Sequence, residues 1–117
     1  MERPRIFLDT QSTTSREYVA LLNVRISNDA LGISYLTLAI DPDPNALYRI
    51  KIGKIFDVTD VELTAVWALE LPHLTKGIYA GFGTGDPIFI AHRVKPTAPN
   101  GTQIKTSFTC AFNEVVP

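Results

Sequence analysis

Cysteine is nearly absent from this chain of 117 residues, since Cys110 is the only one. A single thiol cannot form a disulfide within the chain, so a fold stapled by internal disulfides is excluded. Cys110 alternates with Phe108 and Phe112 along a predicted strand, where a free cysteine usually packs as a small apolar residue. We therefore interpret Cys110 as a buried structural thiol and not as a nucleophile.

Long apolar runs are also missing. No stretch approaches the roughly 20 apolar residues that a membrane-spanning helix needs. The first nine residues carry charges and lack the apolar segment of a signal peptide. We expect a cytoplasmic or virion-associated protein that does not bind a membrane.

Neither sign of charge is in excess, because Lys and Arg total 11 and Asp and Glu total 12. Without a strong net field we expect no nucleic-acid partner. Arg49, Lys51 and Lys54 form a local basic run. The run itself has no interleaved aromatic residue on its face, which binding to a single strand of nucleic acid would require, so we interpret it as a solvated strand face.

Motifs for catalysis and cofactor binding are lacking. His73 and His92 are the only histidines, and neither has a carboxylate or thiol at the spacing of a zinc site. The Gly-x-Ser-x-Gly motif of serine hydrolases is absent as well. We expect no cofactor and no metal, and we favour a protein that is not an enzyme. An enzyme without recognisable motifs stays open as an alternative.

The chain does have apolar residues at every second position, in short segments separated by Gly, Pro, Asn and Asp. This pattern is typical of an all-β protein. The predicted strands cover residues 6–8, 17–27, 33–40, 48–56, 60–71, 77–82, 87–95 and 102–115, with a loop over 10–15 and a hairpin loop over 28–32. We predict one domain over residues 1–117, an antiparallel β-sandwich of jelly-roll or Ig-like type with seven or eight strands. A closed β-barrel is the alternative.

The segment from Asp60 to Leu71 contains the only tryptophan, Trp67. Six apolar residues alternate along it, which predicts one continuous core strand with Trp67 in the core. The same segment opens with Thr59 and Glu62 at the spacing of a helix capping box. A helix from Asp60 to Leu71, and with it an α+β fold, is therefore a second possibility.

Loops between the predicted strands could line a small-ligand or carbohydrate site at one end of the sandwich. One of them begins like a calcium loop, but Ala46 and Ile52 stand where such a loop needs glycine and glutamate. Another is rich in glycine, yet neither a Lys-Ser or Lys-Thr pair nor a helix follows it, as a phosphate loop requires. A third covers residues 96–101. The candidate ligand residues are Asp41, Asp43, Asn45, Gly83, Thr84, Gly85 and Asp86.

Several predicted strands carry apolar residues on their second face too. A sheet that faces water is normally polar on its outer side, so these residues indicate a covered surface. The cover could be a further layer of the same chain or another subunit. The candidate interface residues are Val19, Leu21, Ile33, Tyr35 and Phe89. We predict a non-enzymatic interaction or assembly module that associates with itself, with another protein as a further possible partner and a ligand-binding module as the alternative function.

Overall fold

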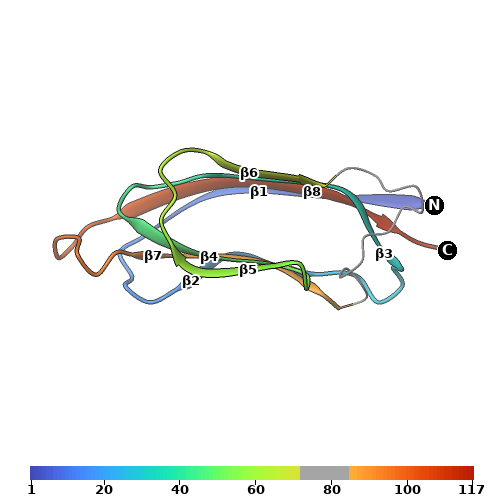
Figure 1. Ribbon diagram of the computed structural model, residues 1–117, viewed down its shortest axis with the longest axis horizontal. Coiled ribbons are helices and arrows are strands. Elements are labelled where there is room, and N and C mark those ends of the chain that lie inside the picture. Colours follow the sequence, from blue (N-terminus) through green and yellow to red (C-terminus); the bar gives the residue numbers. More distant parts are fainter. Residues whose placement is uncertain (72–84) are drawn as a thin grey trace.

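The computed structural model describes residues 1–71 and 85–117, and this part of the chain is all-β. Its strands form two layers (Figure 1). They are β1 (Glu2–Thr13), β2 (Val19–Arg25), β3 (Gly32–Asp41), β4 (Ala46–Ile52), β5 (Phe56–Val61), β6 (Trp67–Leu71), β7 (Pro87–Val94) and β8 (Ile104–Val115). The described residues include no helix that could cross a membrane. The strand predicted over residues 77–82 lies outside the described residues.

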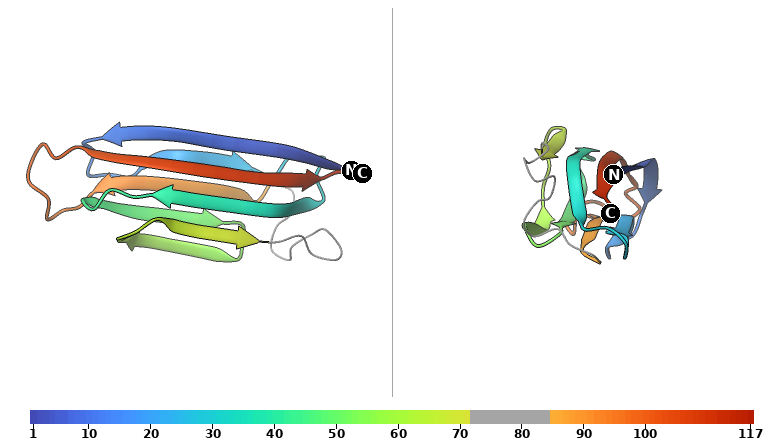
Figure 2. Two further views of the ribbon diagram at one scale, coloured as in Figure 1. Left: turned by 90° about the horizontal axis from the view of Figure 1, so that it is seen from above. Right: turned by 90° about the vertical axis from the view of Figure 1, so that its right-hand side faces the viewer.

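Each layer is an antiparallel sheet of four strands. Sheet A has the order β1-β8-β3-β6 and sheet B the order β2-β7-β4-β5 (Figure 2). The first strand pairs with the eighth, the second with the seventh, the third with the sixth and the fourth with the fifth. The described part of the chain is thus a set of nested antiparallel strand pairs folded into a sandwich, the arrangement of an eight-stranded jelly roll. The predicted β-sandwich is confirmed, and the closed-barrel alternative is wrong.

The core lies between the inner faces of the two sheets. Successive side chains of a strand point to opposite sides, so β4 and β8 bury every second residue, and the edge strands β1, β5 and β6 are only partly buried on their inner face. The largest buried side chains are Tyr48, Ile26, Ile33, Leu36, Leu38, Ile40, Ile50, Ile52, Ile88, Ile90, Ile104 and His92. Cys110 lies in the same core, and burial raises the pKa of its thiol to about 12. The thiol is therefore protonated and a poor nucleophile at neutral pH.

The segment from Asp60 to Leu71 is neither one strand nor a helix, so both predictions for it are wrong. It contains the end of β5 in sheet B, a connection over residues 62–66, and β6 in sheet A. Asp60 has a positive φ of 55° at an irregularity in the β4–β5 ladder, where β5 is about to end. Alternation continues across the break because both strands turn their apolar residues toward the same core.

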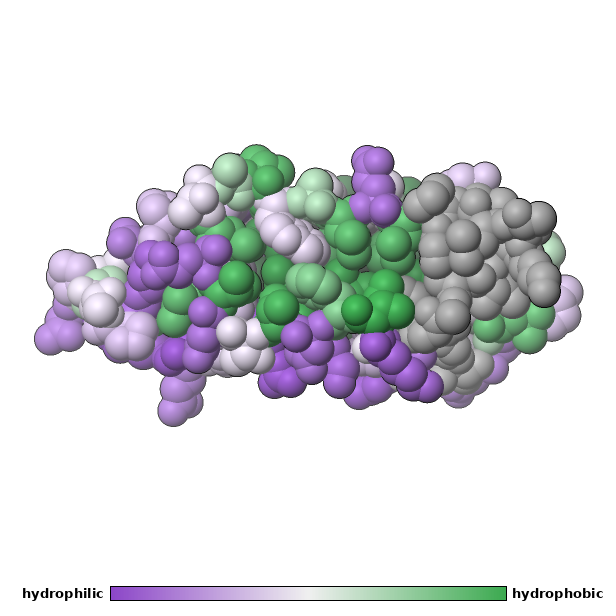
Figure 3. Space-filling model, viewed as in Figure 1, coloured by the Kyte–Doolittle hydropathy of each residue, from purple (hydrophilic) through white to green (hydrophobic). Residues whose placement is uncertain are grey.

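Trp67 begins β6 at the edge of sheet A and is half-buried. Its ring packs against Phe56 of β5, with 5.7 Å between the ring centroids. Figure 3 views the side of the molecule that carries β5 and β6, and apolar atoms gather there between the two layers. Trp67 therefore covers the margin of the core and does not occupy its centre.

The predicted strand over residues 48–56 is two strands, β4 and the beginning of β5, separated by a turn at residues 53–55. Two connections nearer the N-terminus also differ from the prediction. β1 runs to Thr13 and pairs with β8 along its whole length, although residues 10–15 were expected to form a loop. Its polar residues are compatible with a strand because β1 is an edge strand and is exposed on one side. Residues 28–32 do not close a hairpin, since β2 and β3 belong to different sheets. Both differences follow from long-range pairing, which local turn chemistry does not encode.

Candidate interaction surface

The middle of the outer face of sheet A is poor in charge, although Glu2, Asp41 and Lys105 lie toward its ends. In one row across its four strands, Leu8, Thr109, Ala39 and Ala68 lie side by side. The neighbouring row, in the same strand order, is Ile6, Ala111, Thr37 and Glu70. These eight residues are called the sheet A patch below. Only one of them is charged, whereas a sheet face in water normally presents many polar and charged side chains.

The two largest apolar residues of the sheet A patch lie on the edge strand β1. Ile6 is 69% exposed and Leu8 is 71% exposed. Edge strands in natural proteins are usually protected by charges, proline or bulges, because their free backbone groups can pair with another chain. β1 has Pro4 near its start, but Ile6 to Leu8 has no such protection. This part of the edge is suited to association.

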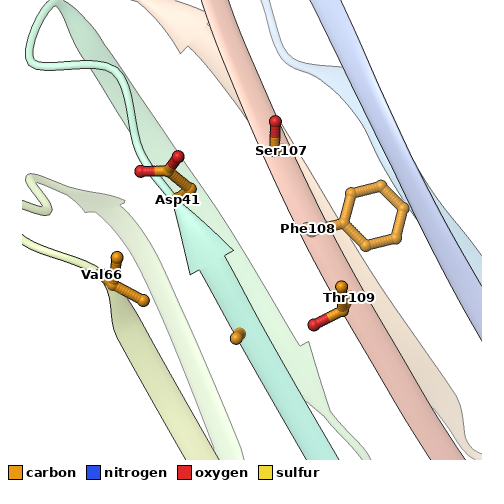
Figure 4. A pocket seen from close by; sticks show the side chains of 6 residues that line it. Asp41, Val66, Ser107, Phe108 and Thr109 are labelled. Atoms are coloured by element: carbon orange, nitrogen blue, oxygen red, sulfur yellow. The ribbon is translucent and has the colours of Figure 1, made fainter.

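A shallow groove lies beside these large residues. It has a volume of about 140 Å³ and is lined by Ala39, Asp41, Val66, Ser107, Phe108 and Thr109. Figure 4 shows that these residues come from β3, β8 and the connection that leads into β6. Most of the lining side chains are short, so the backbone of the sheet is within reach of another molecule. The face thus combines large residues at one margin with a hollow toward the other.

Tyr35 extends the same side of the molecule. It has a positive φ of 55° where the register between β3 and β8 shifts, between Ser34 and Thr37. Such a conformation is rare for a bulky side chain and marks a β-bulge, which changes the direction of the side chain. The Tyr35 side chain is half exposed and lines a second hollow with Leu36, Thr37, Glu70 and Leu71.

The strongly paired charges of the protein lie away from the sheet A patch. Asp29 has a lowered pKa because it accepts a hydrogen bond from Arg3. Asp60 has a lowered pKa because Tyr18 and Arg93 donate to it. Neither carboxylate belongs to the two rows of the patch. The patch would therefore lose little charge solvation if another surface covered it.

The predicted interface residues do not form one surface. Leu21 and Ile33 are 6% and 0% exposed and belong to the core. They are already covered by their own chain, so the structure does not place them on an outer face. Val19 and Phe89 are in sheet B, and Tyr35 is in sheet A. Ile6 and Leu8, which were not among the predicted residues, are more exposed than any of these five.

The predicted ligand loops lie at opposite ends of the sandwich. Ala46 pairs with Val94 and Ile52 pairs with Ile88, so the loop before β4 and the segment before β7 are separated by the length of β7. Asp43 has a structural role, since its carboxylate accepts hydrogen bonds from the backbone of Asn45 (2.8 Å) and Lys105 (3.0 Å).

The remaining ligand candidates divide between the sheet A face and the far end. Asp41 lines the groove of sheet A. Gly85 and Asp86 lie just before β7, where the Asp86 carboxylate is 4.0 Å from Lys54 Nζ. Gly83 and Thr84 lie outside the described residues. The loop over residues 96–101 follows β7 at the same end as the loop over residues 41–45, where Lys95 N donates to Asn45 O (2.9 Å), and Gly85 and Asp86 lie at the other end, so the three loops do not share one rim.

Groups for catalysis or metal binding are not gathered in the described part of the chain. His92 is fully buried in the core, and His73 is outside the described residues. No cluster of three His, Cys, Asp or Glu side chains suited to a metal ion occurs within residues 1–71 and 85–117.

No protein-family model, curated protein or solved structure matches this chain.

Proposed function

We propose that the protein is an assembly module that associates with a second copy of itself through the outer face of sheet A. The observation that carries this proposal is the sheet A patch, which has seven uncharged residues out of eight and two highly exposed aliphatic side chains on an edge strand. An exposed apolar surface of this kind typically marks a protein interface.

The distribution of side-chain sizes favours a second copy as the occupant. A twofold axis parallel to the strands, placed between β8 and β3, puts β1 of one copy over β6 of the other. In this arrangement Leu8 lies over Ala68 of the second copy, and Thr109 lies over Ala39. In this row a large residue then meets a small one on each side of the axis, as an isologous interface allows. In the neighbouring row the same axis places Ile6 over Glu70 of the second copy, so the Glu70 side chain has to extend past the β6 edge for its carboxylate to stay hydrated.

The size of the face indicates the strength of the association. Four strands spaced about 4.8 Å apart, over about eight residues of about 3.3 Å each, give a footprint of roughly 500 Å². A standard stable interface buries about 800 Å² per partner, so this one is at the small end. We therefore expect a reversible dimer that depends on concentration, and not a permanent one.

Sedimentation equilibrium of three proteins tests the proposal. The wild type should shift from the 12.9 kDa monomer toward a dimer as its concentration rises. Ala68→Lys places a charge on an exposed position of the sheet A patch, so it should stay monomeric while keeping its fold. Thr59→Lys makes the same change in charge on an exposed position of β5 in sheet B, and it should associate like the wild type.

Two results would contradict the proposal. One is a wild type that remains monomeric up to about 1 mM, which would mean that the face has no useful affinity for itself. The other is equal association of the wild type and Ala68→Lys, which would place the contact elsewhere. Circular dichroism of each variant verifies that the fold is kept.

A further inference from the structure

A second notable surface lies on the outer face of sheet B, on the opposite side of the sandwich. A hollow of about 270 Å³ is lined there by Asn23, Arg25, Arg49, Lys51, Pro87 and Phe89. Its residues come from three adjacent strands, β2, β7 and β4. Phe89 is at the centre, because it pairs with Asn23 on one side and with Lys51 on the other. The strand order thus places the Phe89 ring and a third cation, Arg25, beside Arg49 and Lys51.

The three cations of this hollow, Arg25, Arg49 and Lys51, form no ion pair with a carboxylate of residues 1–71 or 85–117. Arg93, on the same face, differs in this respect, because its guanidinium is 3.0 Å from the Asp60 carboxylate. Asp57 lies opposite Lys51 in the β4–β5 ladder and is the carboxylate nearest to it in register. The hollow therefore has a local positive charge in a protein whose net charge is only −1.

The Arg49 side chain is held in place by a contact with an aromatic ring, which leaves the hydrogen-bond donors of its guanidinium group unused among residues 1–71 and 85–117. Its guanidinium carbon lies 5.7 Å from the centroid of the Phe89 ring, a cation–π contact that fixes the direction of the side chain. Its Nε is shielded from solvent and has no hydrogen-bond acceptor in the described part of the chain. Arg25 is anchored by a 2.9 Å hydrogen bond from Nη1 to the backbone oxygen of Gly85. Both guanidinium groups are thereby oriented in advance and still have donors to offer.

We propose that this hollow binds a dianion of the phosphate type, either inorganic phosphate or the phosphate group of a small molecule. Arg25, Arg49 and Lys51 supply the charge, the Asn23 amide supplies a neutral donor, and Phe89 is a positioning residue that orients Arg49. Planar guanidinium groups match the geometry of phosphate oxygens and can bind two of them at once. The volume admits a small ligand. The site does not depend on self-association through sheet A, because it lies on the other sheet.

Titration of ¹⁵N-labelled protein at low ionic strength tests the site, with inorganic phosphate, a nucleoside monophosphate and acetate as three separate probes. Phosphate should shift the amides around Phe89 with saturation, and acetate should do so far less. Tighter binding of the nucleotide than of phosphate would identify a phosphorylated small molecule as the preferred ligand. Equal binding would identify the bare anion. Addition of salt should weaken all binding, since the site is exposed.

Four variants distinguish binding at a defined site from nonspecific attraction of phosphate by surface charge. Arg49→Gln should raise the phosphate dissociation constant at least about fivefold, and Phe89→Leu should raise it too, although it removes no charge. Asp57→Asn should lower the constant, because it removes the nearest carboxylate. Lys105→Gln makes the same change in charge as Arg49→Gln on sheet A and should alter the constant less than about twofold. The proposal is overturned if phosphate causes no saturable shift, or if Lys105→Gln weakens binding as much as Arg49→Gln.

Discussion

His92 and Thr106 are joined inside the sandwich, with 2.9 Å between His92 Nδ1 and Thr106 Oγ1, and neither side chain is exposed. The Thr106 hydroxyl also lies 2.6 Å from the hydroxyl of Tyr48, which accepts a hydrogen bond from the backbone of Asp43. This polar chain joins sheets A and B across the apolar core. His92 Nε2 has no partner within the described residues, so protonation would bury a charge that little compensates.

The stability of the protein should therefore fall below neutral pH. Burial lowers the pKa of His92 from its ordinary value, and the charge of Asp43 opposes this only in part. Because the pKa is depressed, the contribution of neutral His92 to the free energy of unfolding is fully present above the unfolded-state pKa of about 6.5. This contribution is lost as the pH falls below that value, by up to about 1.4 kcal/mol per pH unit. The free energy of urea unfolding at pH 7.5 and 5.5 measures the effect.

His73→Gln provides the background for this measurement, because it leaves His92 as the only histidine. The loss of stability between pH 7.5 and 5.5 should persist in His73→Gln and disappear when His92→Gln is added. A flat stability profile in His73→Gln would show that the pKa of His92 is not lowered in the folded protein and would contradict the account.

Glu114 is a buried carboxylate, and its removal should be costly. Its side chain is fully buried and accepts hydrogen bonds from Ser27 N (2.7 Å) and from Arg3 Nη2 (2.9 Å). Glu114→Gln keeps the shape but removes the charge that Arg3 and Arg5 face. Because both arginines keep some access to water, we expect a loss of about 2–3 kcal/mol at pH 7, measured by urea unfolding.

The acid dependence of Glu114→Gln provides a second test of the same network. Burial by itself raises the pKa of Glu114, but the hydrogen bonds from Ser27 and Arg3 and the charge of Arg5 outweigh it, so the pKa is lowered. The stability that the carboxylate contributes is present above about pH 4.5 and is lost as the pH falls further. The variant should therefore lose less stability on acidification than the wild type. Asp29→Asn, which changes an exposed partner of Arg3, should have a much smaller effect at pH 7.

Trp67 should contribute less to stability than a fully buried tryptophan. Full burial would make Trp67→Ala cost about 3–5 kcal/mol, but Trp67 lies at the β5–β6 edge and is half-buried, so we expect about 2 kcal/mol. The neighbouring Val66→Ala is the control. Val66 is 63% exposed, and its truncation should change the unfolding free energy by less than about 0.5 kcal/mol. Equal losses in the two variants would contradict the packing described for Trp67.

The fold class could be predicted from sequence because alternation of apolar residues is a local signal. The β8 residues Phe108, Cys110 and Phe112 alternate in the sequence and are all buried in the structure. The assignment of strands to sheets could not be predicted in the same way. The segment from Asp60 to Leu71 keeps its alternation while it passes from sheet B to sheet A, because both sheets enclose the same core. Periodicity specifies which face is buried, but not which sheet.

The two candidate surfaces depend on neighbours that are distant in sequence. Arg49 and Phe89 are 40 positions apart and meet only because β4 pairs with β7. Leu8 shares a row with Thr109 and Ala39 only because β8 inserts between β1 and β3. The spacing of Ile6 and Leu8 was the one local signal for the sheet A patch, since it places both on one face of a strand. Whether that face is inner or outer follows from the pairing with β8.

The central claim, self-association through sheet A, is tested most directly by ¹⁵N spectra of the wild type at low and high protein concentration. The account predicts shifts that depend on concentration at the amides of the sheet A patch, above all those of Leu8, Ala39 and Thr109. Asn23 and Phe89 on sheet B should remain unchanged. Spectra that do not change with concentration, or changes confined to sheet B, would contradict the proposed assembly.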